Sequence, residues 1–159
     1  MFQLFRSRPY TDPDLGDLVR RRGMWRGRID LPSAADVPLA LIGSRTVPRP
    51  EALKIAAQLK QSIADLRPAI ARALYEHYSP YAEAVAAGEE PVPMSALPAI
   101  EAPADVWRHV RVVFVSVAPL DGHLSAEIGF STAWDEEHTL GVRFRDGQLI
   151  DLCGSVLPP

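Results

Sequence analysis

Residues 120–147, LDGHLSAEIGFSTAWDEEHTLGVRFRDG, form the stretch that decides the expected fold of this chain. An Asp-Gly pair lies near each end, and this pair is typical of two-residue β-hairpin turns. Between the two pairs, apolar and polar residues alternate, first up to Trp134 and again from Leu140 onward. Such alternation places one face of a strand in a core. The stretch therefore predicts an antiparallel meander.

The meander is expected to gain a strand on each side. Residues 110–118 are almost all apolar, which is typical of a central strand that is covered on both faces. Residues 148–153 follow the second turn and are expected to form the last strand. A single helical turn over residues 105–107 is expected just before the first of these strands.

A second meander is expected near the N-terminus. Residues 25–31 alternate strictly and predict a half-buried strand, and residues 37–43 predict its neighbour. Pro38 cannot donate a backbone hydrogen bond, so the start of that neighbour is expected at an edge or facing solvent. Residues 15–20 are interpreted as a further short strand, although one helical turn beginning at Asp12 and Pro13 also fits this region.

A long helix is expected between the two meanders, beginning at Pro50. Apolar residues recur at steps of three or four from Ile55 to Leu74, which predicts one stripe that faces a core. Pro68 lies inside the stripe and favours either one kinked helix or two nearly collinear helices with Asp65 as the second cap. The pair before residue 81, Ser79-Pro80, predicts another short helix that ends at residue 88.

Residues 89–103 carry four prolines without periodicity and are expected to form a long connection. The segments on either side are each small for an independent core, so residues 1–159 are interpreted as one domain. The predicted fold class is α+β. It comprises an antiparallel sheet of about six to seven strands in two meanders, with one long, proline-kinked helix packed on one face.

Composition excludes several classes of protein. The net charge of −3 argues against general nucleic-acid binding, and the basic run 20–22 is interpreted as a solvated turn with acidic residues nearby. No apolar run approaches the roughly 20 residues that span a bilayer, and no signal peptide is recognised. The single cysteine, Cys153, fits a reducing compartment. We therefore expect a cytoplasmic protein without membrane or nucleic-acid partners, and the sequence leaves its oligomeric state open.

The candidate site is the run of five residues from Trp134 to His138. Trp134 is in phase with the apolar face of its strand and is expected to lie in the core. Asp135, Glu136, Glu137 and His138 are interpreted either as a solvated loop or as the rim of a binding surface. No cofactor or metal is predicted, because His138 with Asp135 or Glu137 supplies two ligands and a catalytic zinc needs three.

The same run carries a resemblance. Residues 134–142, WDEEHTLGV, followed by FRDG, resemble a W-D-x-E-H-G-L-G-V type signature of an uncharacterised bacterial domain family, with Thr139 where glycine is usual. The earlier pieces LGDL (15–18) and MWRGRI (24–29) are similar in kind to the N-terminal part of that family. The resemblance implies an accessory or immunity-like protein of bacterial conflict systems, and hence binding in place of catalysis.

The hypothesis that the sequence favours is a protein-binding module, immunity-like or regulatory, whose partner is a toxin or an effector with a basic surface. The alternative is a metal-dependent or acid/base hydrolase that uses Asp135, Glu137 and His138. An acid–base pair would need one carboxyl with a raised pKa, and nothing in the sequence shows the necessary burial. A structural role for Trp134, in which its side chain fills space between the helix and the sheet, is compatible with the binding hypothesis.

Overall fold

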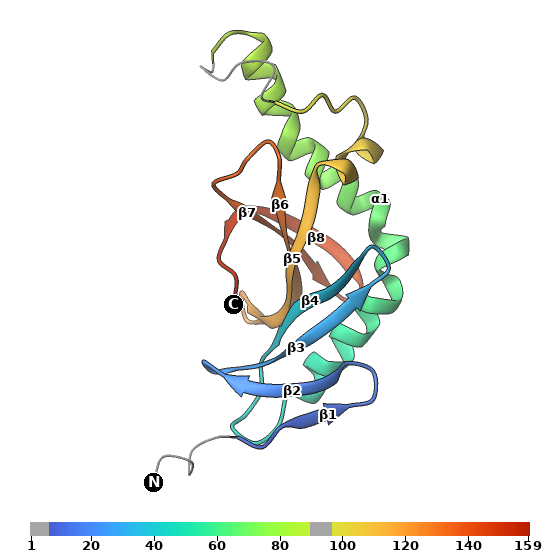
Figure 1. Cartoon of the computed structure of the whole chain (residues 1–159), viewed down its shortest axis with the longest axis vertical. Helices are drawn as coiled ribbons and strands as arrows, with labels where there is room; N and C mark the ends of the chain where they lie inside the picture. The colour runs from blue at the N-terminus through green and yellow to red at the C-terminus, as the bar shows by residue number, and fades with distance from the viewer. Residues whose placement is uncertain (1–6, 90–96) are drawn as a thin grey trace.

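The computed structural model describes residues 7–89 and 97–159. Eight strands form one sheet in which each strand lies beside its neighbours in the sequence (Figure 1). All adjacent pairs are antiparallel except β4 and β5, which pair in parallel with Leu39 opposite Val115. The strands are β1 (Tyr10–Asp12), β2 (Gly16–Arg21), β3 (Met24–Leu31), β4 (Ala34–Leu41), β5 (Val110–Leu120), β6 (His123–Thr132), β7 (Thr139–Arg145) and β8 (Gln148–Val156).

The structure confirms the α+β class and the two antiparallel meanders, β1–β4 and β5–β8, and it corrects two details. The sheet has eight strands where six to seven were predicted, because β1 has only three residues and is too short to show alternation. The sheet is also mixed. The chain leaves β4, runs through helix α1 (Pro50–Ala86) and returns in β5, and a long crossover of this kind allows neighbouring strands to be parallel.

The two Asp-Gly turns have the predicted conformation. In both turns the two central residues have positive φ, with values of 50° and 77° at Asp121 and Gly122 and of 51° and 74° at Asp146 and Gly147. Positive φ at both positions defines the type I′ turn, whose twist matches that of a hairpin. These turns set the register of β5 with β6 and of β7 with β8 at the turn ends.

Helix α1 runs without interruption through both Pro68 and Pro80. The predictions of a second helix capped by Asp65 and of another beginning at Ser79 are therefore wrong. The Ser79 hydroxyl donates to the Tyr75 carbonyl 2.9 Å away inside the helix, so it does not act as a cap. Packing explains the continuity: the apolar stripe stays buried on both sides of Pro68, at Leu59, Ile63, Ile70 and Leu74.

Helix α1 covers one face of the sheet and lies against β3, β5, β6 and β8, and its C-terminal end extends beyond the strands (Figure 1). The predicted end at Gly88 is confirmed. Gly88 has a φ of +71° and donates its amide to the Val85 carbonyl, as expected for a glycine just past a helix end. In the described part of the chain, no helix is long and apolar enough to span a membrane.

The predicted proline-rich connection, 89–103, falls partly on residues 90–96, which lie outside the described residues. From residue 97 the chain returns along α1, where Tyr78 donates its hydroxyl hydrogen to the Pro98 carbonyl and accepts the Ile100 amide, at 2.6 and 3.3 Å. A 3-10 helix, η2 (Pro103–Arg108), then packs on α1 and leads into β5. It corresponds to the helical turn that was predicted there.

A single apolar cluster joins both meanders to α1. Trp25 of β3, Leu74 of α1, Ile128 of β6 and Leu140 of β7 are all fully buried in it. Trp134 also belongs to this cluster and is only 6% exposed, which confirms its predicted place in the core. The stripe of α1 and the alternating faces of the strands thus meet in the same core.

Candidate functional site

Trp134 anchors the corner between β6 and β7 to the helix. Its indole packs edge-on against the Tyr78 ring, with the ring centres 5.5 Å apart. Its Nε1–H group donates to Nδ1 of His77 across 3.1 Å. Since Nδ1 accepts this hydrogen bond, the neutral His77 ring carries its proton on Nε2. The indole therefore fills space in the core and also makes a specific polar contact with α1.

Asp135 is the polar centre of the corner and is only 9% exposed. Its amide donates to the Thr132 hydroxyl, and its carboxylate accepts from the Tyr81 hydroxyl at 3.0 Å. The carboxylate also accepts from the backbone amide of His138 at 3.2 Å and lies 2.9 Å from Nδ1 of that imidazole. A buried carboxylate requires partners of this kind, and Asp135 obtains them from the loop and from the helix.

The pKa values reflect this arrangement. Burial alone would raise the pKa of the Asp135 carboxyl, but hydrogen bonds from His138 and Tyr81 outweigh it and hold the pKa below its usual value. Burial lowers the pKa of His77, and the nearby charge of His138 acts in the same direction, while Asp135 opposes them. At neutral pH the Asp135 carboxylate is therefore ionised and accepts hydrogen bonds. The His77 imidazole is uncharged and accepts the hydrogen bond from Trp134.

Glu136 and Glu137 lie at the outer tip of the same corner and are exposed. Neither makes a hydrogen bond or an ion pair with another residue within 7–89 and 97–159. The His138 side chain is 47% exposed, so one side of its ring faces Asp135 and the rest is open to solvent. The predicted site residues therefore divide into two groups: Trp134 and Asp135 support the corner from inside, and Glu136, Glu137 and His138 form its surface.

The structure brings Asp135 and His138 together, as a hydrolytic site would need, but it leaves Glu137 outside. Among the described residues, no group of three or more His, Cys, Asp or Glu side chains is placed to hold a metal ion. His77 and Tyr81 come from α1 and complete the corner, and neither was predicted as a site residue. Their spacing of four residues on the helix was a signal, because it places both on one face.

Three arginines of the basic run and the strand after it make side-chain contacts with other parts of the chain. Arg20 donates to the Ser44 carbonyl, and Arg26 donates to the carbonyls of Arg21 and Pro159. Arg28 lies 3.7 Å from the Asp36 carboxylate. Arg21 and Arg22 of the run itself are exposed, at the end of β2 and in the turn after it, in agreement with the interpretation of the run as a solvated turn.

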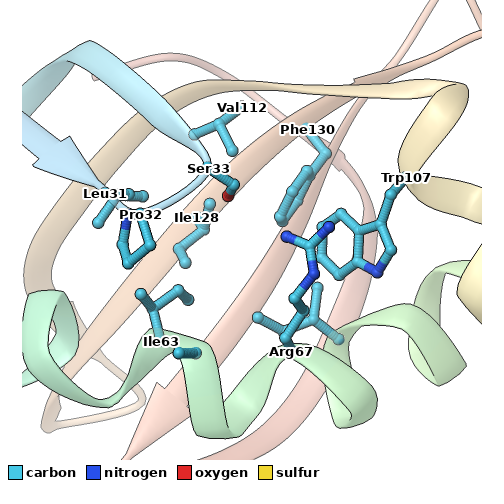
Figure 2. Close-up of a pocket in the computed structure, with 11 residues that line it drawn as sticks. Leu31, Pro32, Ser33, Ile63, Arg67, Trp107, Val112, Ile128 and Phe130 are labelled. Carbon is cyan, nitrogen blue, oxygen red and sulfur yellow. The ribbon is translucent and has the colours of Figure 1, made fainter.

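A cavity of about 310 Å³, which was not predicted from the sequence, opens between α1, the β3–β4 turn, η2 and the sheet. Figure 2 shows Arg67 extending from the helix with its guanidinium group against the Trp107 ring. The guanidinium carbon lies 3.9 Å from the centre of that ring, and the Trp107 ring in turn lies 6.3 Å from the Phe130 ring. The walls are mainly apolar and include Leu31, Ile63, Ile70, Val112, Ile128 and Phe130.

Comparison with known proteins gives one match. A family model described as a domain of unknown function (DUF6985) matches residues 16–155. No curated protein and no solved structure matches the chain. The expectation of an uncharacterised domain family is thereby confirmed at that level, and the match carries no activity with it.

Proposed function

We propose that this chain, which belongs to the family of the domain of unknown function DUF6985, is a protein-binding module that uses the β6–β7 corner to contact a basic partner. The observation that carries the proposal is the difference in burial between neighbouring carboxylates of the corner. Two neighbouring carboxylates, Glu136 and Glu137, are exposed, while the residue before them is buried and fixed by hydrogen bonds. A charged surface on a rigid base is well suited to binding another protein.

The rigid support of the corner by Trp134 and Asp135 lowers the entropic cost of binding. A loop that must be ordered on association loses conformational entropy, whereas a loop that is already fixed does not. Trp134 and Asp135 are bonded to His77 and Tyr81 of α1, so the tip between residues 135 and 138 is held at both ends. The glutamates therefore present their charge from a defined position without a large ordering cost.

The charge of the tip indicates the chemistry of the partner. Exposed carboxylates at an interface rim act mainly on the rate of association and its salt dependence, and they select partners of opposite charge. A basic protein surface meets this requirement. The WDEEH run resembles the signature of an uncharacterised bacterial domain family, and this resemblance implies, by analogy, an immunity-like protein. On that analogy the partner is a toxin or an effector, and the domain would act as its immunity or regulatory protein.

The experiment compares three forms of the full chain as bait in cells that express its natural partners. The variant Glu136→Gln/Glu137→Gln removes the charge of the tip, and Asp14→Asn/Asp65→Asn removes two exposed carboxylates elsewhere. We expect the tip variant to lose a basic partner that the wild type and the control retain. With the purified partner, we expect association to slow about three- to tenfold at low salt. Equal recovery by all three forms, or the absence of any partner, would overturn the proposal.

The hydrolase hypothesis rests on one observation, the contact between the Asp135 carboxylate and the half-exposed His138 imidazole. A carboxylate that orients a histidine is a common part of acid–base sites. Its metal-dependent form lacks a ligand set within the described residues. Substitution of Glu136 distinguishes the binding hypothesis from the hydrolase hypothesis. Removal of its charge would weaken a contact with a protein partner and would leave a reaction at Asp135 and His138 unchanged.

A further inference from the structure

The cavity beneath the β3–β4 turn lies apart from the corner, on another part of the interface between helix and sheet. In Figure 2, α1 runs below the cavity, the turn after β3 lies on its left, and Trp107 of η2 lies on its right. Its volume of about 310 Å³ falls at the lower end of the range for small-molecule sites, roughly 300–1,000 Å³. Sites of this type combine apolar walls with a few polar groups that orient the ligand.

Arg67 is the charged residue of this lining, and Ser33 at the turn is the other polar side chain. The Arg67 side chain is half-buried, and within the described parts of the chain it makes no hydrogen bond or ion pair. Its contact is with Trp107, over which the guanidinium carbon lies at 3.9 Å. A guanidinium group that rests against a ring keeps N–H donors at its edge, and two of them match the oxygens of a carboxylate.

We propose that this cavity binds a small apolar carboxylate, such as a medium-chain fatty acid or an aryl acid. The carboxylate accepts hydrogen bonds from Arg67, and the apolar part lies among Ile63, Ile128 and Phe130. Both the apolar part and the carboxylate of the ligand then contribute favourably to the free energy of binding. The apolar part leaves water, which is favourable in proportion to the apolar surface that is buried, and Arg67 acquires the counter-charge that its described protein neighbours do not supply.

The lining also excludes other ligand classes. A phosphate or another dianion would bring two negative charges to a lining with one cationic side chain, Arg67, and its remaining oxygens would face apolar walls. A cation would be repelled by Arg67. A neutral apolar molecule would fit the walls but would leave the Arg67 donors unused, so its affinity should be lower by the contribution of a charge-assisted hydrogen bond.

The first test measures binding of decanoate, decanol and decyltrimethylammonium to the full chain by calorimetry and by the indole N–H resonance of Trp107. We expect saturable one-to-one binding of decanoate that shifts the Trp107 resonance. Decanol should bind about tenfold more weakly, and the ammonium compound more weakly still. Equal binding of decanoate and decanol, or no binding of decanoate below its micelle concentration, would overturn the proposal.

Variants test the assigned roles. Arg67→Met keeps an apolar contact with Trp107 and should weaken decanoate binding about tenfold, while decanol binding stays unchanged. Ser33→Trp should obstruct the cavity and abolish binding of both compounds. Arg111→Met is the matched control, because Arg111 is exposed beside Val112 and its side chain does not line the cavity. An equal loss in the Arg111 variant, or no loss in the Arg67 variant, would contradict the proposal. Thermal unfolding of each variant checks that it is folded.

Discussion

The indole Nε1 of Trp134 lies 3.1 Å from Nδ1 of His77, a residue that is 57 positions earlier in the chain. This hydrogen bond joins the corner after β6 to the C-terminal half of α1, where Tyr81 also binds Asp135. The corner is thus built by two parts of the protein, and both sets of contacts can be tested by substitution.

Trp134→Ala should destabilise the fold by about 3–5 kcal/mol, because it leaves a cavity where the indole packs against Tyr78. Trp134→Phe keeps most of the packing and loses the hydrogen bond to His77, so it should cost less. The measurement is the free energy of unfolding in urea. Glu136→Ala is the control and should lie within about 0.5 kcal/mol of the wild type. A cost for Trp134→Ala as small as that of the control would show that the indole does not support the core.

Acid should reduce stability through His77. Its pKa is lowered by burial in the folded state, so the unfolded chain binds the proton more readily. The stabilising contribution is complete above the ordinary histidine pKa of about 6.5 and is lost as the pH falls from there towards the folded-state pKa. Asp135 and His138 are the charged groups that face this ring.

Urea unfolding of the wild type and of His77→Gln, measured from pH 7.5 to pH 5, should show a shallower loss of stability in the variant. NMR titration of the His77 ring should give a pKa below that of the unfolded chain. A folded-state pKa at or above the unfolded value would contradict the assignment.

Asp135→Asn should destabilise the protein by about 1–3 kcal/mol, since the buried group loses its charge-assisted hydrogen bonds with His138 and Tyr81. Tyr81→Phe removes one of these donors and should cost about 0.5–1.5 kcal/mol. Because the two residues are in contact, the double variant should cost less than the sum of the two single variants. Strictly additive costs, measured by denaturant unfolding, would argue against the Tyr81–Asp135 contact.

Gly129→Ala should be strongly destabilising, because a methyl group at this position of β6 would collide with the Phe114 ring of β5. Both residues are buried, and overpacking of this kind costs about 1–3 kcal/mol. Phe114→Leu in the Gly129→Ala background should recover part of the loss. Ser131→Ala, two residues further along the same strand, is the control. A Gly129→Ala variant as stable as this control would indicate a different strand register.

Local sequence predicted much of the fold because the relevant signals are local. The conformation of Asp121-Gly122 and Asp146-Gly147 depends on residues within each turn, and the stripe from Ile55 to Leu74 depends on helical spacing. The two prolines of α1 show the limit of such reasoning. Taken alone, Pro68 and Pro80 argue for breaks, but burial of the stripe on both sides of Pro68 favours one continuous helix.

The candidate site was predicted in part for the same reason. From the WDEEH run, Trp134 was predicted as core because it is in phase with the strand before it, and the two glutamates were predicted as exposed because they are charged residues of a loop. The run could not identify His77 and Tyr81. His77 lies 57 positions before Trp134 in the chain, and Tyr81 lies 54 positions before Asp135. The run also assigned Asp135 to the surface with its neighbours, whereas the hydrogen bonds from Tyr81 and His138 allow this carboxylate to be buried.

By itself, the sequence determined the strands other than β1, their hairpin turns, the helical region after residue 50 and the apolar faces of these elements, because periodicity and turn chemistry act within a few residues. Only the tertiary structure decided the parallel pairing of β4 with β5, the network around Trp134 and Asp135, and the cavity beside Arg67. Each of these depends on which buried faces meet across long separations in the chain. Many pairings of such faces bury the same apolar area, so local pattern alone cannot choose among them.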